Sequence, residues 1–372
     1  MATQTYPPSG ANGTVGLREA GGGSPAAPRG DFIPQLWSDE ILASYKQNLV
    51  LSPLVSKINH NGKKGDAIVF PSPTRASASA KAAGTAVTLI YNNESSITLT
   101  IAKHFEYSRL IEDIMDVQAL SSLRQFYVND AGYALATRVD RHISLLWHYF
   151  NAGNATPAAA NLFETAVIGS DGSTAFSGGS GGGNGTALTD AGIRRMIQTL
   201  DDNDIPVSER VIVIPPVEKK NLLGIPRYTE QAFVGESGGA NSIRNGLVGE
   251  VYGMPIYVTT NCPVIHVETT TTNTQLVNFS TTALAASTTD EYGLTVDFTG
   301  KTDTRWRVGA MFHRSALVHI EQMGVRTQTQ YKQEYLADLM TVDTIYDVGR
   351  LRDGGTGTNS MATAGLAFVV PA

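Results

Sequence analysis

The sequence predicts an α+β fold that combines one long helix, a long hairpin and several short strands. Residues 111–150 place apolar side chains mostly three or four positions apart, as one stripe of a helix requires. Residues 97–101 alternate apolar and polar side chains, and residues 211–214 form a short apolar run ended by prolines, so both segments are typical of strands. With 372 residues, of which 42% are hydrophobic, the chain can bury a sizeable core.

The N-terminal region divides into two parts by composition. Residues 1–30 are rich in Gly, Pro, Ala and Ser, and such a segment cannot bury enough apolar surface to fold alone. They are expected to form a flexible arm. In residues 31–56, apolar side chains recur at helical steps, and Ser38 or Asp39 is available as a cap. A short helix that ends near Pro53 is expected there.

Residues 57–107 indicate a hairpin with a long polar tip. Its two strands are expected at residues 67–70 and 97–101, with an Ala-, Ser- and Thr-rich stretch between them. A tip of this length and polarity has little to pack against within its own chain. We therefore expect residues 72–96 to lie on a neighbouring subunit.

The long helix is expected within residues 108–160. Its roughly 40 residues would extend about 60 Å, and Gly132 is the position at which a bend or a break is expected. Glu112, Asp113 and Asp116 would fall in its first turns, where carboxylates interact favourably with the positive end of the helix dipole. This explanation suffices for the acidic cluster without a catalytic role.

Residues 161–345 alternate helix and strand signals. Residues 188–200 have the pattern of a helix, and Thr186 precedes them as a candidate cap. The strand expected at residues 211–214 is stopped by Pro215 and the proline that follows it. Mixed α and β structure is therefore expected throughout this region.

A strand, a turn and a second strand are expected over residues 247–263. Gly253 permits a positive φ in the turn, and Pro255 fixes φ where the second apolar run begins. The Thr- and Ser-rich residues 265–305 are expected to form an inserted loop or hairpin. Their proposed role is a surface decoration or a site for an accessory protein.

The remaining elements are less distinctive. Strands are expected at residues 308–312 and 316–320, and residues 331–339 are expected to be either a helix or an extended segment. Residues 346–372 form the C-terminal segment. No internal repeat is present in the sequence.

Composition excludes several classes of protein. The formal net charge is −6 and no run of Lys or Arg forms a basic stripe, which argues against sequence-specific DNA binding. The single cysteine, Cys262, excludes an internal disulfide and is expected to act as a small buried hydrophobe in a reducing compartment. No signal peptide and no run of about 18 apolar residues is found, so secretion and membrane insertion are not expected.

The candidate chemical motifs favour structural roles. The glycine-rich residues 178–186 lack the Lys-Ser/Thr ending of a phosphate loop, and residues 201–204 lack the ligand spacing of a calcium loop. His142 and His148 are six positions apart, off a common helix face, and no His-Glu-X-X-His pattern accompanies them. His313 and His319 are likewise separated by apolar residues. No enzyme, metal site or cofactor is predicted.

Four segments, taken in their order along the chain, carry a resemblance to a known family. They are Phe32–Trp37, Glu209–Pro216, residues 247–263 and Arg307–Leu317. With the arm, hairpin and long helix they resemble the Hong Kong ninety-seven fold of tailed-bacteriophage major capsid proteins, including those of podophages and cyanophages. The resemblance implies an N-arm, an E-loop hairpin, a spine helix, a P-domain and an A-domain.

The resemblance also implies a function and partners. Copies of the chain would form hexamers and pentamers of an icosahedral head that encloses double-stranded DNA, without catalysis or cofactor. Further expected partners are a separate scaffolding protein, a portal, a decoration or cement protein, and packaged DNA bound non-specifically, but no membrane. Assembly would take place in the host bacterial cytoplasm and yield the virion shell. The candidate intersubunit contacts are Phe32, Trp37, Lys63, Lys64, Arg75 and Lys81.

The sequence leaves two alternative functions open and gives no support for a crosslink between subunits. Some family members join a hairpin lysine to an asparagine of a neighbour, but no matching asparagine and activating glutamate can be assigned here, so crosslinking is not expected. An encapsulin-like compartment shell would share the fold and package an enzyme instead of a genome. A carbohydrate-binding surface module would use the Thr-rich strands, although the long helix and the lack of an export signal argue against it.

Overall fold

The structure, a computed structural model, describes residues 50–60, 65–73, 78–87, 89, 94–112, 123–152, 163, 167–176, 184–225, 249–268, 275–279, 282, 284, 287–289, 295–297, 303–351 and 364–372. All of them belong to one unit of the chain, Lys46–Ala372. The arm expected over residues 1–30 and the helix expected over residues 31–56 lie outside the described residues, except at the end of that helix. There, Ser52–Leu54 form a short 3-10 helix, η1.

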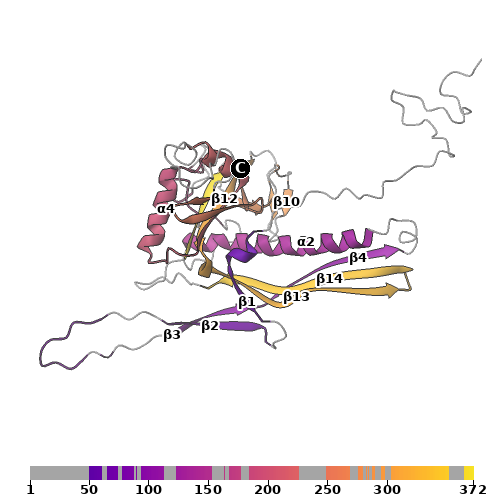
Figure 1. Cartoon of the computed structure of the whole chain (residues 1–372), viewed down its shortest axis with the longest axis horizontal. Coiled ribbons are helices and arrows are strands. Elements are labelled where there is room, and N and C mark those ends of the chain that lie inside the picture. The colour runs from indigo at the N-terminus through magenta and orange to yellow at the C-terminus, as the bar shows by residue number, and fades with distance from the viewer. Residues whose placement is uncertain are drawn as a thin grey trace, which may run out of the picture. The chain divides into compact units, whose positions relative to one another are not determined.

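A four-stranded sheet with the strand order β1-β13-β14-β4 forms one half of the fold. Its strands are β1 (Ser56–Asn59), β13 (Leu317–Lys332), β14 (Ala337–Arg350) and β4 (Lys103–Glu112). β1 runs parallel to β13, whereas the other pairs are antiparallel. The long helix α2 (Leu123–Leu145) lies along this sheet, as Figure 1 shows.

Alternation along the strands decides which face of this sheet receives the helix. Ala131 and Leu135 of α2 are buried against Val342 of β14, with Phe105 and Tyr107 of β4 packed beside them. Side chains at alternate positions of a strand point to the same face, so the even-numbered side chains of β4 point to the opposite face. The helix therefore covers one face and leaves the other for polar groups and the hairpin.

The expected hairpin is present as an antiparallel ribbon of β2 (Ala67–Pro73) and β3 (Glu94–Thr100). The base of the ribbon packs in a cluster with β1 and β13, where Leu99 and Phe70 join the buried Ile320. At Gly349 of β14, a Cβ atom would lie 2.5 Å from a methyl group of Leu99, so the absence of a side chain admits the hairpin. The strands predicted at residues 67–70 and 97–101 are confirmed.

A seven-stranded sheet forms the other half of the fold, with the order β6-β7-β5-β12-β8-β9 and β15 paired to β12. Its strands are β5 (Arg210–Ile214), β6 (Glu250–Val251), β7 (Met254–Val258), β8 (Val264–Glu268), β9 (Gln275–Asn278), β12 (Asp303–His313) and β15 (Gly365–Pro371). β5 and β7 are parallel, and the remaining pairs are antiparallel. The strands predicted at residues 211–214 and 308–312 are confirmed.

The largest core cluster surrounds this sheet. Ile212, Phe312 and Phe368 are fully buried in it, and burial of each such side chain stabilises the fold by about 1.5–3 kcal/mol. Gly309 of β12 lies under the ring of Phe368, because a Cβ there would come within 2.6 Å of ring carbons. The C-terminal strand β15 is therefore a central part of the core, which the sequence reading did not predict.

The helices of this half begin with clear local signals. α4 (Asp190–Asp202) starts after Thr189, which has an extended backbone and whose hydroxyl oxygen accepts the N–H of Gly192 at 3.2 Å. The expected cap, Thr186, is wrong: its hydroxyl lies 2.6 Å from that of Ser170 instead. α5 (Pro216–Leu223) begins with proline, which is tolerated in a first helical turn.

Within the segment 247–263, the described residues 249–263 contain a strand, a turn and a strand, as predicted. β6 and β7 are joined by Tyr252 and Gly253, which have φ values of 52° and 78°. Two positive φ values in a two-residue connection match the twist of a hairpin, and glycine adopts such a value without strain. Cys262, just beyond β7, is fully buried as expected, and burial raises the pKa of its thiol to about 12.

The long helix begins later than expected. Ile111 and Glu112 belong to β4, which pairs residue for residue with β14 up to Ala337, so the prediction of Glu112 in a first helical turn is wrong. Asp113 and Asp116 lie outside the described residues. α2 continues through Gly132, and a 3-10 turn, η2 (Leu146–His148), separates it from α3 (Tyr149–Ala152).

Residues 331–339 are the end of β13, a turn and the start of β14, so of the two alternatives the extended segment is confirmed and the helix is wrong. The insertion expected at residues 265–305 needs correction. Within residues 265–305, β8 and β9 form a hairpin that extends the main sheet, and Ile265 and Val267 are fully buried. These strands are not a peripheral insertion; a second hairpin, β10 (Ser287–Thr289) and β11 (Thr295–Asp297), forms its own two-stranded sheet. The strand predicted at 316–320 starts at Leu317, after a 3-10 turn, η3 (Arg314–Ala316).

Candidate assembly surfaces

The tip of the β2–β3 hairpin exposes apolar side chains. Its turn is formed at Gly84, with a φ of 80°, and the Thr85 hydroxyl donates to the carbonyl of Ala82 at 2.8 Å. Between this turn and β3, Val87 is 66% exposed and Leu89 is 76% exposed. Apolar surface of this kind is typical of a protein–protein contact.

Of the six candidate contact residues, the structure places one. Lys81 lies in the exposed stretch before the hairpin turn. The other five, Phe32, Trp37, Lys63, Lys64 and Arg75, lie outside the described residues. Their roles stay predictions.

A second apolar tip joins β13 to β14. Tyr335 and Leu336 in the turn are 64% and 65% exposed, and Tyr331 on the adjoining strand is 45% exposed. Leu336 has a φ of 45°, in the left-handed region where a Cβ atom meets the following carbonyl oxygen. An exposed leucine in this conformation costs the isolated chain stability. A contact with another molecule at the hairpin tip accounts for it better than the stability of the isolated chain does.

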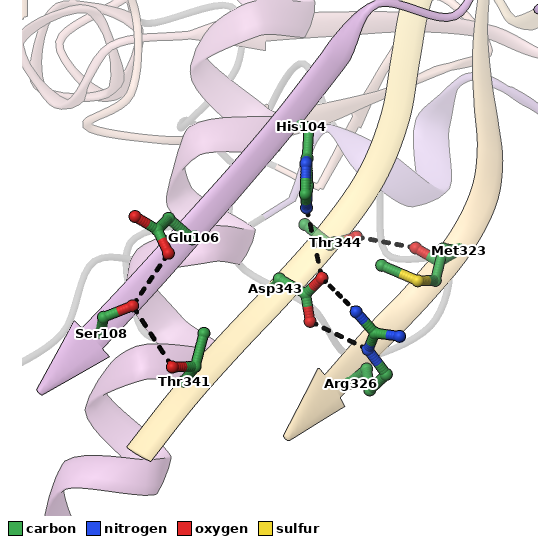
Figure 2. Close-up of polar contacts among 8 residues, drawn as sticks. All are labelled: His104, Glu106, Ser108, Met323, Arg326, Thr341, Asp343 and Thr344. Carbon is green, nitrogen blue, oxygen red and sulfur yellow. Dashed lines mark hydrogen bonds and ion pairs between the residues drawn. The ribbon is translucent and has the colours of Figure 1, made fainter. Parts of the chain in front are cut away.

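The sheet face opposite α2 carries a polar network that spans three strands (Figure 2). Asp343 of β14 accepts hydrogen bonds from Nε and Nη2 of Arg326 at 3.1 and 2.8 Å. His104 of β4 approaches the same carboxylate through Nε2 at 3.2 Å. Beside it, the Ser108 hydroxyl lies 2.9 Å from Glu106. One carboxylate thus ties β14 to both of its neighbours.

This network lies where an irregular stretch of β13 ends. The register between β13 and β14 shifts between Glu321 and Met323 and again before Arg326, so β13 bulges there. The Thr344 hydroxyl donates to the carbonyl of Met323 within the bulge at 3.0 Å. The guanidinium of Arg326 holds the pKa of Asp343 below its usual value, because it stabilises the carboxylate. Regular pairing continues from Arg326 to the hairpin tip.

Aromatic and histidine side chains fill the space between α2 and the sheet. His142 of α2 contacts the Tyr346 hydroxyl through Nδ1 at 2.8 Å, and the Phe105 ring lies 5.2 Å from the His142 ring. Burial, together with the positive charges of Arg138 and Lys103, lowers the pKa of His142 to about 4. Burial likewise lowers the pKa of His148 to about 4. These histidines are structural, as predicted.

The remaining motifs are a turn after α4 and a glycine-rich loop, and the structure describes them in part. Among the described residues, no three His, Cys, Asp or Glu side chains lie close enough together to hold a metal ion. Asp201 forms an ion pair with the buried Arg210 at 2.7 Å, and residues 203–204 turn after α4, as predicted. Most of the glycine-rich loop 178–186 lies outside the described residues. No helix in the described part of the chain is both long and apolar enough to cross a bilayer.

The exposed apolar residues were missed by the sequence reading. Val87 and Leu89 alternate within an Ala- and Thr-rich stretch, and that alternation was the available signal for one apolar edge. Tyr335 and Leu336 interrupt a polar run between two strands. An apolar pair at the place where a turn is required indicates a surface that another molecule covers.

Comparisons with known proteins agree on one family. A family model described as phage capsid protein matches residues 37–346, most of the chain. A chain of Mycobacterium phage Che8 is 20% identical with a TM-score of 0.59, covering 91% of this chain and 97% of its own. The capsid of cyanophage P-SCSP1u is 17% identical with a TM-score of 0.59, covering 91% of this chain and 93% of its own.

A third solved structure shows how far the fold persists when the sequence has changed. The capsid asymmetric unit of cyanophage Pam1 is only 9% identical, yet its TM-score is 0.62, and the match covers 93% of this chain and 98% of the other. No curated protein is similar in sequence at a significant level. The structural matches confirm the predicted Hong Kong ninety-seven-type fold. The chain therefore belongs to the phage capsid protein family and is a major capsid protein, a structural component of the shell of a phage head.

Proposed function

We propose that copies of this capsid protein associate into hexamers and pentamers, which close into an icosahedral shell around double-stranded DNA. Each stable contact in such a shell needs about 1,600 Å² of buried surface in total. The contacts must be heterologous, because a ring closes only when one surface of a copy meets a different surface of the next copy. A subunit with several projecting apolar tips meets this requirement.

The observation that carries the proposal is the exposure of Leu89 and Val87 on the β2–β3 hairpin. Leu89 has the largest exposed fraction among the large hydrophobic side chains of the described residues, at 76%. The base of the hairpin packs on its own sheet, whereas these two side chains are left to water. Covering them with a neighbouring copy removes apolar surface from water, at about 25 cal/mol per Å².

We further propose which parts of the fold take which family names. The β2–β3 hairpin is the E-loop and α2 is the spine helix. The four-stranded sheet beneath α2 is the P-domain, and the seven-stranded sheet is the core of the A-domain. The expected boundaries, residues 57–107, 108–160, 161–345 and 346–372, stay a proposal. Within residues 265–305, only the β10–β11 hairpin remains a candidate for surface decoration.

The remaining partners and the non-enzymatic role are also proposals. A scaffolding protein, a portal and a decoration or cement protein would join the shell in the host cytoplasm, and packaged DNA would contact it non-specifically. The network of Asp343 and the buried histidines is explained by packing and ion pairing alone, which supports a mechanical role. No step of assembly needs bond formation.

Substitution of Leu89 tests the proposal. Leu89→Ser in the full-length chain, expressed with the scaffolding protein, should reduce the assembled fraction in velocity sedimentation while leaving the thermal unfolding of the subunit unchanged. Val207→Ser is the matched control, because Val207 is also exposed, at 65%, but lies in the turn before β5. Wild-type assembly by the Leu89 variant would contradict the role of the hairpin.

A further inference from the structure

The first described residues of the chain are held by a side chain that lies far away in the sequence. Asp140 of α2 accepts three consecutive backbone N–H groups: those of Val50 and Leu51 on Oδ2, at 3.0 and 3.3 Å, and that of Ser52 on Oδ1, at 3.1 Å. Both carboxylate oxygens are used. The sequence separation is 88–90 residues, so the contact joins the start of the described chain to the C-terminal third of the long helix.

The local sequence cannot supply this contact. The 3-10 helix η1 begins after Leu51, which has no capping side chain, and Pro53 in its first turn has no N–H to donate. Helix starts leave backbone donors without partners, and a Ser, Thr, Asp or Asn usually accepts them. Here the acceptor comes from another element. Asp140 is thus a cap supplied across the fold.

The contact is buried but is not sealed from solvent. Asp140 is 1% exposed and Leu51 is fully buried. The carboxylate also borders an open cavity of about 190 Å³ between α2 and β13, lined in addition by Ser52, His319 and Glu321. Such a cavity is large enough for several water molecules. The cavity therefore leaves room for water beside Asp140.

The charges around the contact oppose one another. Burial raises the pKa of Asp140, whereas the three N–H donors and the positive charge of Lys57 on β1 lower it. On β13, burial lowers the pKa of His319, which keeps that ring neutral, and Glu321 adds a like charge to the same cavity. The carboxylate is therefore held mainly by its backbone donors, and an uncharged side chain at this position cannot accept all three.

We propose that Asp140 is a positioning residue that anchors residues 50–52 to helix α2 and thereby fixes the place where the expected N-terminal arm joins the described part of the fold. An arm that is part of the chain can contact only those surfaces of a neighbouring copy that lie within its length of the anchored residues. The position of the anchor therefore determines which surfaces the arm can reach. The anchor itself follows from the contacts alone. Its importance for assembly rests on the proposed function.

Hydrogen exchange of the full-length protein tests the anchor. In Asp140→Asn, one oxygen becomes an amide donor that faces backbone N–H groups, so exchange at residues 50–52 should become about tenfold faster or more, as loss of hydrogen bonds to a charged acceptor implies. Peptides from β5 and β15 should keep wild-type exchange. Asp130→Asn is the matched control, on the same helix about 15 Å away.

The outcomes separate the anchor from the proposed function. Unchanged exchange at residues 50–52, or an equal increase of exchange in β5 and β15, would overturn the anchor regardless of the yield of assembled shells. Faster exchange confined to residues 50–52 with normal shell yield would support the anchor and overturn its role in assembly. If Asp140→Asn does not fold, NMR of wild-type protein labelled with ¹⁵N-leucine decides: the Leu51 amide should follow the titration of one carboxyl group, and a pH-independent signal would overturn the anchor.

Discussion

Arg326 and Asp343 face each other across β13 and β14 at the place where regular pairing resumes after a bulge. Two parallel hydrogen bonds join a guanidinium to a carboxylate that is only 7% exposed at its side chain. His104 completes the link to β4 on the other side. The pair therefore fixes the register of the outer parts of β13 and β14, which carry the exposed tip between these strands.

Removal of this carboxylate should loosen the outer part of the sheet. Asp343→Asn replaces the charged, two-oxygen acceptor of Arg326 and His104 by an amide with one acceptor oxygen. We expect a lower midpoint of urea unfolding, with faster hydrogen exchange at residues 326–332. Glu334→Gln removes the same charge from the exposed turn and should change neither quantity. Equal midpoints for the two variants would show that the network contributes no stability.

Low pH should weaken the same link. The pKa of Asp343 is lowered in the folded protein, so its contribution is present above the unfolded value of about 3.9 and is lost as pH falls through the folded value. Raised salt should weaken the ion pair as well, because the guanidinium of Arg326 is half exposed. Unfolding midpoints measured from pH 5 to pH 2.5 test this; an Asp343→Asn variant should show a smaller decline over that range.

At mildly acidic pH, the loss of stability should come mainly from histidines that burial keeps uncharged. The pKa of His142 is about 4 in the folded protein and about 6.5 in an unfolded chain, so protonation favours unfolding. Stability should therefore fall as pH decreases from about 6.5 to about 4. His142→Asn can retain a contact to the Tyr346 hydroxyl without titrating, and it should reduce this slope. An unchanged slope would contradict the assignment.

Two glycine substitutions should have opposite effects. Gly132 lies inside α2 with no atom within 4 Å of an added Cβ, so Gly132→Ala should raise the free energy of unfolding by about 0.5–1 kcal/mol. Gly309→Ala should lower it by about 1–3 kcal/mol, because the added Cβ would lie 2.6 Å from the Phe368 ring. Urea unfolding of both variants measures the difference, and equal signs would contradict the packing described for β12.

The exposed turn at Leu336 should separate stability from assembly. Leu336→Gly relieves the positive φ, so the free energy of unfolding should stay the same or rise by up to about 1 kcal/mol. The same change removes an apolar side chain from the tip, and the assembled fraction in sedimentation should fall. A variant that assembles normally would show that this tip makes no important contact.

Local patterns predicted much of the fold. The alternation at residues 97–101, the apolar run at 211–214 and the positive φ of Gly253 each depend on neighbours in sequence, and each prediction is confirmed. The start of the long helix was misplaced because Ile111 continues the helical spacing, while its pairing partner, Asp338, lies more than 200 residues later. Such a partner leaves no trace in a local pattern.

The same limit applies to the candidate sites. The contact of Asp140 with residues 50–52 joins groups about 90 residues apart, and the links from Asp343 reach both near and far strands. Lysines in a hairpin, such as Lys81, can be named from the sequence as candidate intersubunit contacts. The exposure of Leu89 and Leu336 was not predicted, because their local patterns mark an apolar edge and a turn but do not show whether the fold covers them.

Electron microscopy of the full-length chain, produced together with the scaffolding protein, tests the central claim most directly. Uniform closed particles with icosahedral symmetry, in which hexamers and pentamers are resolved and the β2–β3 hairpin contacts a neighbouring copy, are the predicted result. A chain that stays monomeric under all assembly conditions would contradict the account.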